Sequence, residues 1–230
     1  MVREKRQYVV AVNSVREIAY KTLRNEIVSM ELKPGMVIST QDIANRLNIS
    51  RTPVREAFIK LQGEELLEIS PQKATIVSRI DVDRLYQEWF IREALEMTNM
   101  RKFATVASRE TIESMRKNIE DQYQALEEKD YVKYLELDNS FHQMEFLDTG
   151  EALAASLLVQ MNGHYDRIRL ITANVNNRAM HIVKEHEKLV DCIVKKNVEG
   201  AVTLLQQHIQ ELQYYQKMAM EMWPEYFVHQ

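Results

Sequence analysis

The sequence predicts a mainly α-helical protein in two parts, a small N-terminal domain with a β-hairpin and a long all-helical body. Proline and glycine are scarce, with four and five among 230 residues. Between residues 80 and 222 there is no proline and there are only three glycines, so this stretch has few places where a helix would break. Charge divides in the same way, because residues 1–80 carry a net charge of +4 and residues 81–230 one of −8. We therefore expect domains at 1–79 and 80–230, the first of them basic enough to suit nucleic acid.

The composition narrows the class of protein further. Hydrophobic residues make up 45% of the chain and charged residues 28%, which is ordinary for a globular protein with a sizeable core. Cys192 is the single cysteine, so no internal disulfide is possible and a reducing compartment fits. No apolar run approaches the ~18 residues of a membrane span, and the N-terminal apolar stretch is too short for a signal peptide. We expect a cytoplasmic protein with no membrane partner.

The first third of the chain has the order of elements of a winged helix-turn-helix. A helix is predicted over residues 14–29, and Pro34 and Gly35 form a turn after it. Thr40 is expected to cap a short helix that ends at residue 47, and Pro53 fits only the first turn of the next helix. The predicted elements are helices at 14–29, 40–47 and 51–64 and β-strands at 66–70 and 75–78, joined by a turn at 71–74.

The body is expected to form a bundle of about six helices. Apolar residues recur at helical spacing through the whole stretch, and polar residues suited to capping precede several of the helices. The expected N-caps are Asp81, Ser108, Asp130 and Asn197. The helices are placed near residues 82–106, 109–128, 130–148, 151–173, 177–196 and 198–222.

The start of the third helix carries the residues expected to read DNA. The second helix of a helix-turn-helix enters the major groove with its N-terminal residues toward the bases. Arg51 and Arg55 are four residues apart, so they project from one face and can reach guanine O6 and N7 or phosphates. In an arbitrary helix such a pair is usually a solvated face, but its place in a helix-turn-helix favours DNA contact. Ser50 and Thr52 are expected to cap the helix or to bind phosphate, and Arg46 is expected to contact the DNA backbone. Lys73, at the wing tip, is expected to reach a groove. The apolar residues of the helix should pack into the core, namely Val54, Ala57, Phe58 and Leu61.

The body contains a candidate metal site. Asp138 and His142 are spaced i, i+4 on one predicted helix, so their side chains point the same way. His186 and His208 lie near the inward apolar stripes of the last two helices. Three imidazoles and a carboxylate would suit Zn²⁺, Ni²⁺ or Mn²⁺ and leave positions for a ligand's oxygens. The alternative is that each histidine is simply a hydrogen-bonded core residue, and the spacing alone leaves both readings open.

A resemblance to a known family adds to this interpretation. The run Ser50-Arg51-Thr52-Pro53-Val54-Arg55-Glu56, within residues 44–57, resembles the signature of the GntR family of repressors, and residues 32–35 are similar to the turn before its second helix. The body resembles the FadR-like subfamily, which has an all-helical (FCD-type) ligand-binding domain. The resemblance covers nearly the whole chain. In the family, glycine is usual where Glu65 and Ala74 stand, so the wing is expected to be shaped differently here.

The resemblance also implies roles for particular residues. Many FadR-like domains carry an Asp-x-x-x-His pair, a histidine after glutamate and one on the final helix, and Asp138, His142, His186 and His208 match that arrangement. In such domains the metal and nearby arginines hold a carboxylate effector. Arg92 matches the arginine of the first helix, with Arg167 and Arg169 as weaker candidates and an exposed salt bridge as the alternative for Arg92.

The expected function is thus a DNA-binding regulator, more often a repressor in this family, whose operator affinity is controlled by a small organic acid. A palindromic operator read by two recognition helices requires a homodimer. One rival is a metal-dependent helical enzyme. The sequence contains no Glu-x-x-His, His-Glu-x-x-His or glycine-rich nucleotide loop, so we expect no enzyme. The other rival is a protein-interaction module without DNA binding, which the methionines and tyrosines could serve.

Overall fold

The computed structural model describes residues 2–70 and 74–228, with side chains from residue 15 onward. The chain forms two compact units, one of Met1–Asp81 with Glu225–Gln230 and one of Val82–Pro224. The first division lies close to the expected boundary at 79/80, but the last residues of the chain belong to the N-terminal unit. The backbone therefore passes between the units twice, once after Asp81 and once after Pro224.

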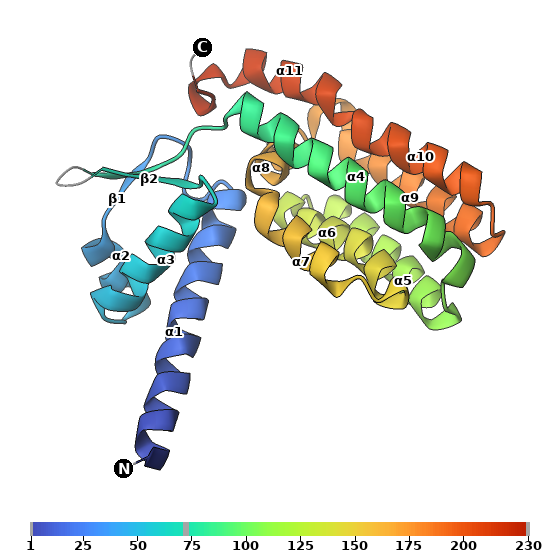
Figure 1. The fold of residues 1–230 in the computed structure, drawn as a ribbon. Helices are drawn as coiled ribbons and strands as arrows, with labels where there is room; N and C mark the ends of the chain where they lie inside the picture. Colours follow the sequence, from blue (N-terminus) through green and yellow to red (C-terminus); the bar gives the residue numbers. More distant parts are fainter. Residues whose placement is uncertain (1, 71–73, 229–230) are drawn as a thin grey trace. The chain divides into compact units, whose positions relative to one another are not determined.

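The N-terminal unit is a winged helix-turn-helix (Figure 1). Its wing is a three-stranded antiparallel sheet in the order β1-β3-β2, with Val37 opposite Ile76 and Leu67 opposite Val77. The short strand β1 was not predicted, and the first helix begins well before residue 14. The elements are α1 (Val2–Val28), β1 (Val37–Ile38), α2 (Thr40–Leu47), α3 (Arg51–Gly63), β2 (Leu67–Ile69) and β3 (Thr75–Val77).

Local signals explain the tight connection between α2 and α3. The N-cap of α2 is Ser39, not Thr40 as predicted, and its hydroxyl accepts a hydrogen bond from the Asp42 backbone N–H at 3.1 Å. Ser39 has extended backbone angles and a short polar side chain, as this position requires. Asn48 ends α2 in the left-handed conformation, with φ 53°, and its backbone N–H returns to the last turn. The chain can therefore enter α3 within three residues.

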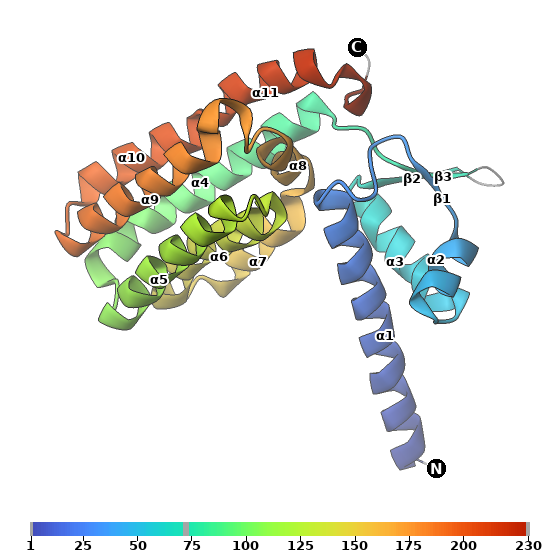
Figure 2. The ribbon, with the colours of Figure 1, turned by 180° about the vertical axis from the view of Figure 1, so that it is seen from behind.

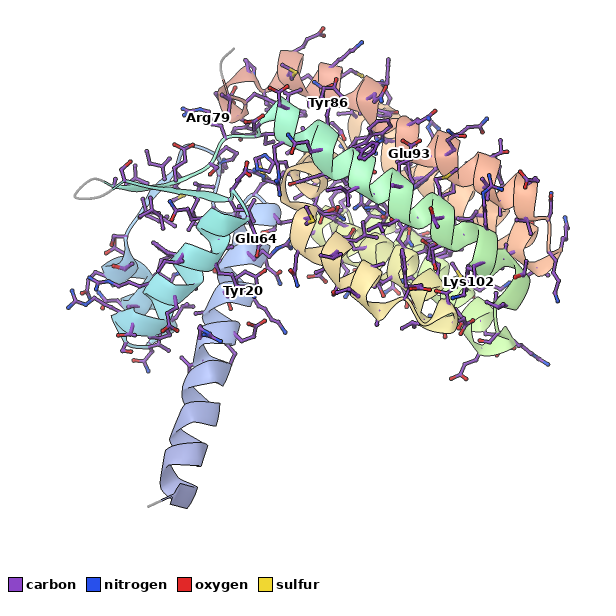
Figure 3. The ribbon with its side chains drawn as sticks, in the orientation of Figure 1. Tyr20, Glu64, Arg79, Tyr86, Glu93 and Lys102 are labelled. Atoms are coloured by element: carbon purple, nitrogen blue, oxygen red, sulfur yellow. The ribbon has the colours of Figure 1, made fainter. Side chains whose placement is uncertain are left out.

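The helix-turn-helix is held by an apolar core and by polar contacts between α1 and the end of α3. Val54, Ala57, Phe58 and Leu61 are all at most 2% exposed, as predicted. Figure 3 labels Tyr20 on α1 and Glu64 just after α3. The Tyr20 hydroxyl donates a hydrogen bond of 2.5 Å to Glu64, which also accepts one of 2.9 Å from Arg24. These contacts join α1 to the end of α3.

Glu65 occupies the turn that leads from α3 into the wing. Its φ is 59°, in the left-handed region that favours glycine. Glu65 therefore adopts a conformation for which glycine is suited, at the position where glycine is usual in the family. The cost is local backbone strain.

The second unit is all helical, but it has eight α-helices among its described residues rather than about six. The predicted helix over 151–173 divides at Asn162, and the one over 198–222 divides at Glu211. The predicted caps Ser108, Asp130 and Asn197 are confirmed, since each side chain accepts a hydrogen bond from the backbone N–H three residues on. The helices are α4 (Val82–Val106), α5 (Arg109–Glu127), α6 (Tyr131–Thr149), α7 (Ala152–Met161), α8 (Gly163–Ile171), α9 (Arg178–Val194), α10 (Val198–Gln210) and α11 (Leu212–Met222).

The break before α8 falls at Asn162 and Gly163, a local turn signal, and a tertiary contact stabilises the new helix start. Glu88 of α4 is 1% exposed, and its carboxylate accepts hydrogen bonds of 2.9 Å from the backbone N–H groups of both His164 and Tyr165. A carboxylate at this point satisfies free donors at the start of a helix and suits the positive end of its dipole. Glu88 thus stabilises the start of α8, which places the side chains of α8 toward the interior.

Helix α4 lies at the centre of the unit and packs against α6, α8, α9 and α10. Figure 2 shows α9 and α10 side by side, as their contacts require. Phe103, Phe141, Val183 and Leu205 belong to the core that these helices share. The polar side chains described below lie in the same interior. No helix of the described residues is both long and apolar enough to span a membrane.

Candidate functional site

The N-terminal turn of α3 presents a polar, cationic surface. Arg51, Thr52 and Arg55 are exposed. Within the described residues neither arginine forms an ion pair, so both guanidinium groups are available to a partner. Ser50 is the N-cap of α3, yet its side chain makes no capping hydrogen bond. Its hydroxyl and the free N–H groups of the first turn form a surface suited to phosphate.

Arg46 and Lys73 are the other two predicted DNA contacts. Arg46 lies in the last turn of α2 with its side chain 45% exposed, and it forms a salt bridge with Glu26. A DNA phosphate would have to compete with this carboxylate or share the guanidinium with it. Lys73, expected at the wing tip, lies outside the described residues.

The structure brings the three predicted histidines together inside the helical unit. His142 comes from α6, His186 from α9 and His208 from α10. One nitrogen from each lies within 4.8 Å of the others, and the Nε2 atoms of His142 and His208 are 3.2 Å apart. The Nε2 atom of His186 is buried and has no hydrogen-bond partner. Three ring nitrogens that meet in this way form a possible site for a cation.

The outward nitrogen of each histidine faces an oxygen atom. Nδ1 of His186 is 3.1 Å from the Gln122 Oε1, and Nδ1 of His208 is 3.0 Å from a Glu185 oxygen. Nδ1 of His142 is 3.1 Å from Glu96. These acceptors favour the tautomer with hydrogen on Nδ1, so the lone pairs of the three Nε2 atoms point to the centre. Metal-ligating histidines are commonly held by such outer partners.

The charge state of the cluster suits a metal as well. Burial lowers the pKa of all three imidazoles, to about 4 for His208 and well below the ordinary value for His186. The histidines are therefore neutral near pH 7, as ligation requires. Three converging neutral lone pairs repel one another unless a cation or a proton lies between them. This set of donors, with the unpartnered His186 Nε2, fits a divalent transition metal.

Asp138, the predicted fourth ligand, lies beside the histidines but is engaged elsewhere. One carboxylate oxygen is 3.7 Å from the His142 Nε2, and the other is 3.9 Å from the His186 Nε2. The Tyr134 hydroxyl donates a hydrogen bond of 3.1 Å to Asp138. Arg169 of α8 forms an ion pair with the same carboxylate. Asp138 thus links the histidine cluster to a buried arginine.

The arginines of the expected effector site are deeply buried. Arg92 is 2% exposed, its Nε is 2.8 Å from Glu96, and its guanidinium carbon lies 4.8 Å from the centre of the Tyr165 ring. It is therefore not the exposed salt-bridging residue that was the alternative. Arg169 pairs with Asp166 at 2.8 Å as well as with Asp138. Arg167 is fully buried, with its Nε 3.2 Å from the backbone oxygen of Gly163 and one terminal nitrogen 3.1 Å from the His164 Nδ1.

Sequence reasoning missed the residues that surround the histidines. Glu96 follows Arg92 by four residues on α4, a spacing that predicts an ion pair but not one buried against His142. Gln122 carries no signal of its own in the sequence, and its role comes from the packing of α5 against α9. Arg178, the first residue of α9, was also missed, although it is only 5% exposed.

The chain matches two family models. Residues 15–77 match the model described as "Bacterial regulatory proteins, gntR family", and residues 89–211 match that of the FCD domain. The chain therefore belongs to the GntR family of regulators with a C-terminal FCD domain. It is a DNA-binding transcription regulator and not an enzyme.

Individual relatives agree with this assignment. The chain is 29% identical over 198 residues to the HTH-type transcriptional repressor RspR of Escherichia coli strain K12, which covers 86% of this chain and 87% of that protein. Among solved structures, E. coli McbR/YncC has a TM-score of 0.78 at 19% identity, with 89% of this chain and 98% of that chain covered. A GntR regulator from Rhodococcus sp. RHA1 has a TM-score of 0.76 at 16% identity, with 89% and 98% covered. At these identities the structural matches show the fold.

Proposed function

We propose that the chain is a metal-dependent ligand sensor in which a small organic acid, bound in the helical unit, controls the affinity of the winged helix-turn-helix for a palindromic operator. The observation that carries this proposal is the convergence of three Nε2 lone pairs with every Nδ1 facing an oxygen. Such an arrangement does not stabilise a protein core by itself, because the inward lone pairs accept no hydrogen bond from a donor.

His142, His186 and His208 would hold a divalent ion of the Zn²⁺, Ni²⁺ or Mn²⁺ type, with Asp138 close enough to serve as a fourth ligand. When bound, the metal would offer open positions to carboxylate oxygens. The Asp138 carboxylate cannot serve the ion and Arg169 equally well. Once it turns toward the histidines, the Arg169 guanidinium loses part of its counter-charge and becomes available to an anionic ligand. Arg92, one helix away, adds positive charge to the same interior.

On the DNA side, Arg51 and Arg55 are proposed to read bases, and Ser50 and Thr52 to bind phosphate. A symmetric operator requires two recognition helices, so the active form is proposed to be a homodimer that acts in the cytoplasm, where its DNA is. Repression is the proposed mode, in line with the name of the repressor RspR. Ligand and DNA need only discriminate between two conformations of the chain. Each then weakens the binding of the other if they prefer different conformations, or strengthens it if they prefer the same one, by the same factor.

The test combines metal content and DNA binding in the same samples. Wild-type protein and the His186→Ala variant are loaded with Zn²⁺, Ni²⁺ or Mn²⁺, and bound metal is measured by mass spectrometry. Genomic fragments recovered with the protein define the operator. We expect about one tightly bound metal per wild-type chain, at least ten-fold weaker binding in the variant, and an operator affinity without ligand that the variant keeps. His164→Ala is the matched control, since His164 is buried but outside the cluster. Full metal occupancy in His186→Ala would refute the site, and no enrichment of any sequence at low salt would refute the operator.

A further inference from the structure

Arg178 is a buried cation that forms no ion pair among the described residues. It is the first residue of α9, and it is only 5% exposed. Among the described residues no carboxylate lies within ion-pair distance of its guanidinium. Arg92 and Arg169, which are buried in the same unit, each have a carboxylate partner. An arginine stays protonated in proteins, so its charge remains after burial. Buried charges are normally paired because leaving them alone is costly.

The contacts that Arg178 does make leave part of its donor set free. One terminal nitrogen donates to the Thr172 hydroxyl at 3.2 Å and to the backbone oxygen of Arg169 at 3.4 Å. The guanidinium carbon lies 4.8 Å from the centre of the Tyr215 ring, which holds the group in place. The Nε atom is buried and has no hydrogen-bond partner. The guanidinium is therefore oriented by neutral groups and still has a donor to offer.

Glu211 is the alternative partner for this charge. Arg178 acts on it electrostatically, opposing the rise in its pKa that burial causes. The two side chains nevertheless form no ion pair, and a Glu211 carboxylate oxygen is itself buried without a hydrogen-bond partner. Glu211 thus interacts with the charge of Arg178 from beyond ion-pair distance.

Arg178 faces the same interior as the histidine cluster. The Tyr134 hydroxyl, which hydrogen-bonds to Asp138, is also acted on by the charge of Arg178. Arg178 and His186 are eight residues apart on α9, which places their Cα atoms about 12 Å apart along the helix. The Arg178 guanidinium also donates to the backbone oxygen of Arg169, whose side chain pairs with Asp138 beside the histidines.

We propose that Arg178 binds a second anionic group of the effector, so that the effector is a small acid with two negatively charged groups, one held at the histidine cluster and one at Arg178. A dicarboxylate and a phosphorylated carboxylate share this chemistry. The proposal rests on the function proposed above, and it narrows the effector from organic acids in general to dianionic ones. No described carboxylate lies within ion-pair distance of Arg178, and an anionic group of the ligand would fill that place.

The first test uses sulfate as a small doubly charged probe of the Arg178 subsite. Melting of the metal-loaded full-length chain is followed in sodium sulfate and in sodium chloride at matched ionic strength. We compare wild type with Arg178→Gln, which removes the charge, and Arg178→Lys, which keeps it. Arg109→Gln is the matched control, since Arg109 has a side chain 93% exposed and pairs only with Glu113 among the described residues. Its sulfate response measures the general stabilisation by this salt.

We expect sulfate to raise the melting temperature of wild type and Arg109→Gln by about 2–4 °C more than that of Arg178→Gln. Arg178→Lys should keep part of the rise. In calorimetry, wild type should bind succinate at least ten-fold more tightly than acetate, and Arg178→Gln should bind the two alike. An equal sulfate response in wild type and Arg178→Gln would overturn the proposal. A wild type that binds succinate no better than acetate would also overturn it, even if the glutamine variant does not fold.

Metal content and operator affinity, measured on the same samples, separate this proposal from the wider one. A wild type that binds neither metal nor operator would defeat the proposed function. Normal metal and operator binding with no dependence on Arg178 would defeat the second anionic subsite alone. In that case the charge of Arg178 would serve Glu211, and Glu211→Gln should then destabilise the chain as much as Arg178→Gln does.

Discussion

Replacing Arg51 and Arg55 with alanine, singly and together, tests the assignment of the recognition helix. Both side chains are exposed and form no ion pair among the described residues. Their removal should therefore change the free energy of unfolding by no more than about 0.5 kcal/mol. Operator binding should respond quite differently. A lost bidentate base contact costs about 1–3 kcal/mol, which is roughly a 5- to 150-fold loss of affinity for each arginine.

The assay is fluorescence anisotropy with the enriched operator and a scrambled duplex, repeated between 50 and 200 mM salt (roughly the range over which phosphate contacts are lost). A base contact would be lost on the operator alone. A phosphate contact would weaken binding to both duplexes and reduce the salt slope by about 0.9. Arg109→Ala removes one positive charge far from α3 in the sequence and serves as the control. Operator affinity and salt slope equal to wild type in the double variant would refute the assignment and favour a protein-interaction role for the N-terminal unit.

Three further predictions concern stability. Glu65→Gly should stabilise the N-terminal unit by about 1 kcal/mol in urea unfolding, because φ at Glu65 is 59°. The control Glu68→Gly, on β2, should destabilise the unit. A loss of stability with Glu65→Gly would show that the side-chain contacts of Glu65 outweigh the backbone strain. Phe227→Ala should lower the free energy of unfolding by about 3 kcal/mol, since Phe227 is 3% exposed and pairs with Ile80 through a β-bridge. The control Val228→Ala, at a residue 45% exposed, should lower it far less. Equal effects would mean that the C-terminal segment does not pack against the N-terminal unit in solution. Burial raises the pKa of Glu88 to about 7, so the folded state favours its protonated form, and stability should fall as pH rises from about 4.5 to 7 and then level off. Glu88→Gln should lack this part of the pH dependence, and identical profiles for the two proteins would contradict the raised pKa.

Much of the N-terminal unit was determined by local signals in the sequence. Pro53 is tolerated only in the first turn of a helix, and it located the start of α3 correctly. The caps at Ser108, Asp130 and Asn197 bond to the backbone N–H three residues away, so their effect is contained within a few residues of sequence. The scarcity of proline and glycine predicted the helical body for the same reason. These features depend on backbone geometry and on near neighbours alone.

The tertiary structure decided what depends on distant parts of the chain. α8 begins where Glu88, more than seventy residues earlier, binds its first N–H groups. Asn162 and Gly163 are a local turn signal at this break, but the sequence does not show which side chain binds the new helix start. The sequence placed His142, His186 and His208 near inward faces, but whether they meet depends on how α6, α9 and α10 pack. The same packing put Gln122 and Glu96 behind the histidines and left Arg178 without a carboxylate. Helical periodicity says which face of a helix is buried, whereas the partners that a polar side chain meets inside are set by the approach of whole helices.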